Sequence, residues 1–232
     1  MATDEKKQQV LPVYLVIDVS YSMAGDAIKS AQQAVDDILF EIKTIPTLAE
    51  SAFIAVITFC ERADRIMPMS NLSYVDASPV LELGASTSYV AAIDAVLADL
   101  RDDVAEMKAN GKAVFRPCVF FLTDGEPTDL DADLDAALQR LHASQPLPNV
   151  IPIGVGQAPE DRLKQLATNG FPAWKANGEL GPAMAEVAKA LVRSVVSSVK
   201  NSQQDQGDGG GAVFDMTPMQ NSPNITPVMD LV

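Results

Sequence analysis

Short apolar stretches alternate with longer segments of helical periodicity along most of the chain. Four stretches are rich in Val, Ile and Phe and apolar on both faces, as covered parallel strands are; they span residues 12–19, 52–60, 117–123 and 149–155. Apolar residues at helical spacing span residues 25–44, 88–109, 131–143, 159–168 and 179–199. This alternation predicts a doubly wound α/β fold, with a mostly parallel sheet and helices on both faces.

One short segment departs from the alternation. Residues 63–69, ADRIMPM, follow the second apolar stretch closely enough to pair with it as a hairpin, which predicts an antiparallel strand. Pro68 lacks the amide hydrogen that an inner strand needs, so it suits an edge. We therefore expect one antiparallel edge strand in the sheet.

The composition divides the chain into three parts. Residues 1–10 form a polar extension, residues 11–199 hold the alternating elements as one domain, and residues 200–232 are rich in Gly, Gln, Asn, Ser and Pro. The last part is typical of a linker followed by a tail. Because it keeps several apolar residues, we hypothesise that it docks in a groove of this domain or of a partner, anchored by Phe214 and Leu231. A disordered tail without a role is the alternative.

The charge of the chain limits its classes of partner. There are 17 Lys and Arg against 31 Asp and Glu, a net charge of −14, and no basic cluster. Nucleic acid and anionic membranes are therefore excluded as expected partners, since phosphate binding depends on clustered Lys and Arg. The polar start and the lack of a long apolar run predict a cytoplasmic protein. Cys60 and Cys118 lie in apolar stretches and are expected to be small buried hydrophobes.

The first predicted strand ends in oxygen-bearing side chains at alternate positions. Asp18, Ser20 and Ser22 point to the same side of an extended chain, at the edge where open α/β sheets bind ligands. A carboxylate with two hydroxyls suits Mg²⁺ or Mn²⁺ better than zinc, and the chain has a single histidine. Capping of the helix that follows is the alternative interpretation of this segment.

Two further segments bring oxygen atoms to the same edge. The third long strand ends in FFLTDGEPTD, which places Asp124 at its carboxyl end. Between the two strands, LGASTSYVAAI brings a hydroxyl cluster to the start of a helix: Ser86, Thr87 and Ser88. Oxygen ligands from three separate segments therefore predict a cation site rather than a simple helix cap.

In this order, the three segments resemble the metal-ion-dependent adhesion site (MIDAS) of the von Willebrand factor type A (VWA) domain, over roughly residues 11–199. The stretches LPVYLVIDVSYSMAGDAI and FLTDGEPTD are also similar to small bacterial VWA proteins associated with tellurium resistance. That narrower resemblance implies an adaptor in a bacterial stress-response system, with a kinase, a phosphatase or an ATPase component as its partner.

The resemblance implies roles for five residues. Ser20, Ser22 and Thr87 would bind Mg²⁺ directly, with Mn²⁺ or Ca²⁺ as alternatives, and Asp18 and Asp124 would hold it through waters or shorter contacts. An Asp or Glu side chain of a partner protein would fill the open coordination position. The implied function is thus metal-dependent protein–protein interaction.

The chain departs from the family pattern at two places. Tyr21 stands where glycine is commonest, and residues 85 and 86 are Ala and Ser where glycines are usual. The ligand of this second segment is therefore open among Ser86, Thr87 and Ser88, with Thr87 assigned by the resemblance. Tyr21 and Tyr89 either form an aromatic rim around the metal or pack loop against loop.

A Mg²⁺-dependent phosphohydrolase with an aspartate nucleophile is the alternative function. Such an enzyme needs a second acid two residues after Asp18 to protonate the leaving group, and Ser20 stands there. The chain has neither a Gly-x-x-x-x-Gly-Lys loop nor a Gly-x-Ser-x-Gly elbow. We therefore expect an interaction module and not an enzyme.

Overall fold

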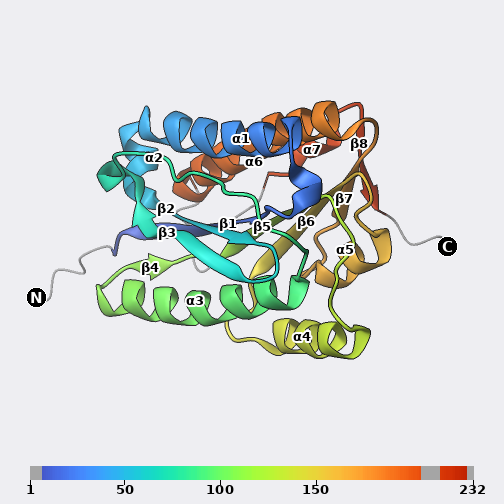
Figure 1. The fold of residues 1–232 in the computed structure, drawn as a ribbon. Coiled ribbons are helices and arrows are strands. Elements are labelled where there is room, and N and C mark those ends of the chain that lie inside the picture. The colour runs from blue at the N-terminus through green and yellow to red at the C-terminus, as the bar shows by residue number, and fades with distance from the viewer. Residues whose placement is uncertain (1–6, 205–214, 229–232) are drawn as a thin grey trace, which may run out of the picture.

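The computed structural model describes residues 7–204 and 215–228, which form one sheet between two layers of helices (Figure 1). The strands are β1 (Gln9–Asp18), β2 (Ala52–Phe59), β3 (Ala63–Asn71), β4 (Ala113–Val114), β5 (Cys118–Thr123), β6 (Asn149–Val155), β7 (Ala173–Ala176) and β8 (Ile225–Val228). The α-helices are α1 (Asp26–Lys43), α2 (Pro46–Ser51), α3 (Tyr89–Ala109), α4 (Asp131–Ala143), α5 (Glu160–Leu166), α6 (Leu180–Gln204) and α7 (Thr217–Gln220).

The sheet has the order β3-β2-β1-β5-β6-β7-β8, with β4 beside the start of β1. Strands β2, β1, β5, β6 and β7 run parallel, whereas β3 pairs antiparallel with β2 and β8 pairs antiparallel with β7. The predicted doubly wound α/β fold is confirmed. The expectation of one antiparallel edge strand is incomplete, because the described sheet has a second one, β8.

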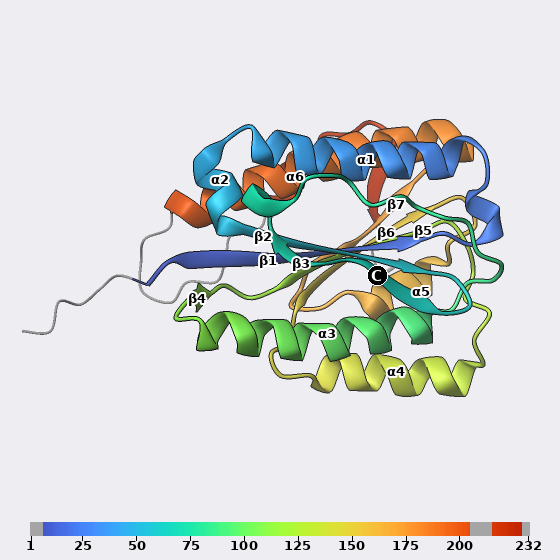
Figure 2. The ribbon, with the colours of Figure 1, turned by 60° about the vertical axis from the view of Figure 1, so that its left-hand side comes forward.

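Both faces of the sheet are covered, as Figure 2 shows for its two helical layers. Val13 and Leu15 of β1 belong to a core shared with α1 and α6, whereas Tyr14 and Val16 belong to a core shared with α3 and α4. Alternate residues of one strand thus enter two separate cores. This is the physical reason why the strand sequences are apolar without interruption.

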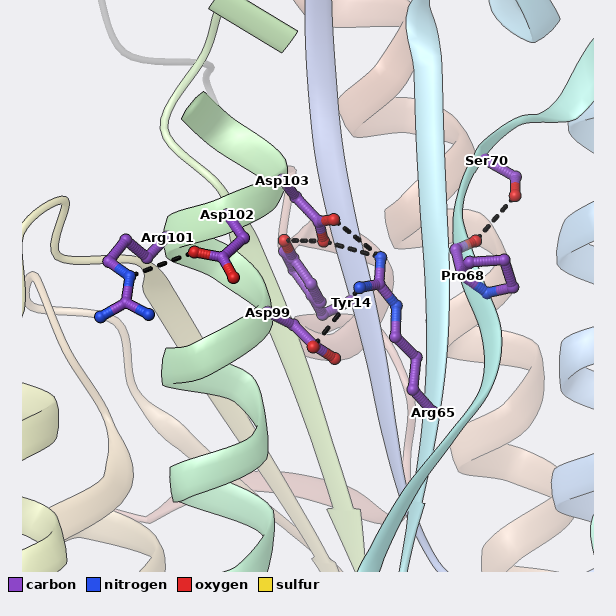
Figure 3. A network of polar contacts seen from close by, with 8 residues as sticks. All are labelled: Tyr14, Arg65, Pro68, Ser70, Asp99, Arg101, Asp102 and Asp103. Carbon is purple, nitrogen blue, oxygen red and sulfur yellow. Dashed lines mark hydrogen bonds and ion pairs between the residues drawn. The ribbon is translucent and has the colours of Figure 1, made fainter. Parts of the chain in front are cut away.

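An ion-pair network fastens the edge strand β3 to α3 across β1 and β2 (Figure 3). Arg65 Nη2 lies 2.8 and 2.9 Å from the two carboxylate oxygens of Asp103, and Arg65 Nη1 lies 3.4 Å from Asp99. The hydroxyl of Tyr14, a fully buried residue of β1, donates to Asp103 at 2.8 Å. The network therefore joins β3 to α3 through the guanidinium of Arg65, and it joins β1 to α3 through the carboxylate of Asp103.

The C-terminal part of the described chain lies on the domain. Helix α6 continues to Gln204, past the boundary expected at residue 199, and residues 215–228 return to the sheet as α7 and β8. Met216, Met219 and Ile225 are buried in the core that α1 and α6 share. The expected anchors Phe214 and Leu231 lie outside the described residues. The segment thus packs on its own domain through three other apolar side chains.

Short elements account for most of the differences from the predicted ones. Strand β7 has four residues, yet it carries Trp174, which is 1% exposed and packs in the larger core. Its conformation is set by pairing with β6 rather than by its own sequence pattern.

Cys60 and Cys118 are buried and form no disulfide, which confirms their interpretation as small apolar residues. None of the helices in the described chain combines the length and apolarity required to cross a bilayer.

Candidate metal-binding site

Three loops meet where β1 and β5 end side by side. Beyond β1, the amide of Val19 donates to the carbonyl of Phe59 at 2.9 Å, and the carbonyl of Val19 accepts from Gly84 at 2.7 Å. The amide of Tyr21 donates to the carbonyl of Ala85 at 3.2 Å. These backbone bonds hold the segment before α3 against the loop that follows β1. The sheet order and these contacts therefore bring the three predicted oxygen-bearing segments together.

Asp18 is the most enclosed member of the group. It is fully buried, its Oδ1 accepts from the amide of Ser20 at 2.8 Å, and its Oδ2 accepts from the hydroxyl of Thr123 at 2.6 Å. Thr123 is also fully buried, at the end of β5. Sequence reasoning missed Thr123, because a threonine in an apolar strand has no distinguishing signal. Each oxygen of Asp18 is therefore held in a fixed direction by a donor of the chain.

A continuous set of polar contacts joins Ser20, Ser22 and Asp124. The hydroxyls of the two serines lie 3.0 Å apart, and the Ser22 hydroxyl donates to Asp124 Oδ1 at 2.8 Å. The second carboxylate oxygen, Asp124 Oδ2, is buried and accepts no hydrogen bond. A buried carboxylate oxygen without a partner is costly, so it marks a place where a cation would be stabilising.

Thr87 lies at this group, beside Gly125. A Cβ atom at Gly125 would lie 3.4 Å from the Thr87 hydroxyl and 3.6 Å from the Ser22 hydroxyl, so both hydroxyls lie close to the same point beside Gly125. The neighbouring Ser88 is already engaged, because its hydroxyl donates to Asp129 at 2.6 Å and accepts from an amide at the start of α3. The geometry therefore favours Thr87 over Ser88 as the oxygen donor of this segment.

The position of Thr87 is set by the loop that follows β5. Its carbonyl accepts from the amide of Thr128 at 2.7 Å and from the Thr128 hydroxyl at 3.0 Å. Asp129 Oδ2 accepts from the amide of Tyr89 at 2.7 Å. Thr128 and Asp129, at the end of the TDGEPTD stretch, thus fix the segment before α3 by hydrogen bonds. No sequence pattern distinguishes Thr128 and Asp129, so their role in positioning Thr87 was not predicted.

The two tyrosines differ in their surroundings. Tyr21 is 76% exposed at the edge of the site, whereas Tyr89 is fully buried and its ring packs edge-on against Phe59 and Phe121. The Tyr89 hydroxyl donates to the carbonyl of Gly125 at 2.9 Å, so it holds the backbone next to Asp124 in place. An aromatic rim that includes Tyr89 is therefore wrong. Packing is its role.

The carboxylates of the site stand in an environment that disfavours their charge. Burial raises the pKa of Asp18, and burial together with the charge of Asp18 raises the pKa of Asp124 to about 6, against the hydrogen bond from Ser22. Within the described chain, neither carboxylate forms an ion pair. Two adjacent carboxylates without a cation would be stabilised by one from solution.

The donor atoms fit a hard cation. They are carboxylate and hydroxyl oxygens only, and no cluster of three or more His, Cys, Asp or Glu suitable for a metal occurs among residues 7–204 and 215–228. A metal here would therefore depend on the hydroxyls as much as on the two carboxylates. Mg²⁺ suits such a set, since it binds few carboxylates and retains water ligands.

Comparison with known proteins agrees with the fold. The chain is similar to a von Willebrand factor type A protein from Catenulispora acidiphila (16% identity, TM-score 0.57, covering 81% of this chain and 43% of that one). It is similar to VWA2, the ArnB paralog of Sulfolobus acidocaldarius (20%, 0.55, 82% and 46%). A third similar structure is proximal thread matrix protein 1 of the mussel byssus with a zinc-occupied MIDAS motif (16%, 0.57, 82% and 49%).

The chain spans less than half the length of each of these three structures. None of the three is a tellurium-resistance protein, so that narrower resemblance stays a prediction. The comparison with curated proteins found no significant match. The profile of the von Willebrand factor type A domain matches residues 13–175, more than half of the 232 residues. The chain therefore belongs to the von Willebrand factor type A domain family.

Proposed function

We propose that this domain is a metal-dependent protein interaction module. VWA domains often mediate such interactions through a MIDAS, and the ligands proposed for one Mg²⁺ ion are Asp18, Ser20, Ser22, Thr87 and Asp124. When bound, the metal would supply an open coordination position for an Asp or Glu side chain of a partner protein. The proposal includes the adaptor role, with a kinase, a phosphatase or an ATPase component as partner.

One observation carries the proposal: Asp124 Oδ2 is buried, has no hydrogen-bond partner and adjoins a continuous group of hydroxyls. Neighbouring residues hold the proposed ligands in place by hydrogen bonds. Thr123 and the Ser20 amide fix the carboxylate of Asp18, and Thr128 fixes the backbone of Thr87. The oxygen-only donor set favours Mg²⁺ here, although the mussel protein with a related fold carries zinc.

Isothermal titration calorimetry with MgCl₂ tests the metal site. We expect weak, saturable binding to the wild type, because Mg²⁺ with few charged ligands keeps much of its water. Asp124→Asn should abolish the binding while circular dichroism shows an unchanged fold. Asp133→Asn, an exposed acid in the first turn of α4, is the matched control and should bind as the wild type does. Equal Mg²⁺ binding by Asp124→Asn and wild type would refute the site.

A further inference from the structure

A groove opens beside the candidate metal site, between the turn from β2 to β3 and the segment before α3. Its volume is about 440 Å³. The residues that give it its character are apolar Val80 and Leu83 and charged Glu61, Arg62, Asp64 and Glu82. None of the five residues proposed as metal ligands lines this groove.

The groove and the metal site share one segment of backbone. Gly84 lines the groove, and Thr87 reaches the metal site three residues later. Three residues of extended chain span at most about 10 Å, so the two places lie within that distance along the backbone. Glu61 accepts from the amide of Ala85 at 3.0 Å, which ties the groove wall to the same segment. A short extended peptide is therefore long enough to cover both.

The lining of the groove is mixed, with more polar than apolar surface, and two exposed side chains form part of its apolar portion. Val80 is 71% exposed and Leu83 is 46% exposed. The amide of Tyr21, which is also exposed, donates to the carbonyl of Ala85, two residues after Leu83. Large exposed apolar side chains that gather beside a binding site favour an apolar group of a partner. The volume is large enough for one bulky side chain such as leucine.

The charge of the groove favours a basic neighbour. Three carboxylates and one guanidinium line it, and the guanidinium of Arg62 is paired with Asp64 at 2.7 Å. The charges of Glu61 and Glu82 are then not neutralised by the guanidinium in the groove. They would attract a lysine or arginine of the partner and repel a second acidic residue. A partner segment made only of acidic residues would therefore bind poorly. It would have no apolar side chain for the groove, and the carboxylates of Glu61 and Glu82 would repel it.

We propose, on the basis of the proposed function, that the metal-bound acid of the partner belongs to an extended segment with two further features. An apolar side chain lies about three residues from the acid and enters the groove, and a lysine or arginine next to it faces Glu82. The metal site thereby recognises the acid, and the groove recognises its context.

Three labelled nine-residue peptides test the proposal by fluorescence anisotropy with the full chain in MgCl₂. The first has a central aspartate, leucine three positions away on each side and lysine as each outer neighbour of leucine. The second replaces leucine by serine, and the third replaces lysine by glutamate. The first should bind about tenfold more tightly than the second, since burying one leucine contributes that much or more. The third should also bind more weakly than the first.

Matched variants localise the effect. Leu83→Ser should remove the preference for leucine, and Glu82→Lys should reverse the preference for lysine over glutamate. Phe40→Ser removes a side chain of α1 that is 69% exposed, away from the groove, and should change neither preference. All binding should disappear in EDTA and in Asp124→Asn.

The outcomes separate the two proposals. Metal-dependent binding of equal strength to all three peptides would overturn the groove proposal and leave the proposed function standing. Preferences that persist in Leu83→Ser and Glu82→Lys would likewise overturn it. If no peptide binds in the presence of Mg²⁺, or if binding is unaffected by EDTA, the groove proposal and the metal-dependent function both fail.

Discussion

The pair Asp99 and Asp103 and the pair Asp18 and Asp124 differ in how their charges are balanced. Asp99 and Asp103 share the guanidinium of Arg65. Asp18 and Asp124 receive hydrogen bonds from hydroxyls and an amide but have no ion pair within the described chain. The chain itself supplies the counter-ion of the first pair, whereas the second pair is buried and has no counter-ion within the described chain.

The difference teaches how a structural cluster is told from a binding site. Buried ionised groups are tolerated when a partner of opposite charge is present. The network around Arg65 meets that condition, and Figure 3 shows its side chains converging between β3 and α3. The pair at the ends of β1 and β5 does not meet it, so its ionised form calls for a cation from outside the chain. The two regions therefore predict opposite responses to the same kinds of change.

Removing the internal cation should have the largest effect. Arg65→Met leaves Asp103 buried, at 7% exposure, without its charge partner, and we expect a loss of about 3 kcal/mol in the free energy of unfolding. Urea denaturation monitored by circular dichroism measures it. Arg101→Met breaks an exposed pair with Asp102 and should cost less than about 1 kcal/mol. A loss for Arg65→Met no larger than that of this control would show that the network is not a structural cluster.

The pH dependence of stability should be the next largest effect. The pKa of Asp124 is raised from 3.8 to about 6 in the folded metal-free protein, so the folded state binds this proton more tightly than the unfolded state does. Its contribution to stability is therefore present below pH 4 and lost as the pH rises through 6, by roughly 2 kcal/mol. The difference in unfolding free energy between wild type and Asp124→Asn isolates it. A difference that does not change between pH 4 and 7 would contradict this assignment.

Neutralising one acid of each pair gives the smallest but sharpest test. Without metal at pH 7, Asp124→Asn should stabilise the protein by up to about 2 kcal/mol, because it removes the carboxylate charge that lowers the stability at this pH. Asp103→Asn should destabilise it, because it weakens the bonds to Arg65 and Tyr14. Differential scanning calorimetry compares the two variants. Equal destabilisation by both would remove the distinction between the clusters.

Added Mg²⁺ provides the control for that comparison. It should stabilise the wild type by about 1 kcal/mol at a concentration several times its dissociation constant. Asp124→Asn should gain nothing, and Asp103→Asn should gain as much as the wild type.

The sequence was informative where one pattern determines one structure. Strands buried on both faces must be apolar throughout, so β1, β2, β5 and β6 were predictable from their residues alone. Parallel strands end at a common edge, which was enough to expect Asp18 and Asp124 together. The supporting donors were not predictable, because Thr123 and Thr128 have no pattern that distinguishes them from other threonines.

Contacts between distant segments were also beyond reach of the sequence. Tyr14, Arg65 and Asp103 meet through packing of β1, β3 and α3, and no spacing in the chain connects them. Strand β8 was missed because residues 200–232 have the composition of a linker, and it is set by pairing with β7. Pairing can impose a strand on a sequence that lacks strand periodicity.

The positions of two prolines affect how this sheet meets other molecules. Pro68 lies in β3 and Pro227 in β8, so each outer strand of the described sheet lacks one amide hydrogen, and both prolines are exposed. An exposed edge strand with free amides is a template for edge-to-edge association between copies, and proline on an edge opposes it. The domain thus discourages recruitment of further strands at both sides of its sheet. Self-assembly into an extended β-structure is correspondingly disfavoured.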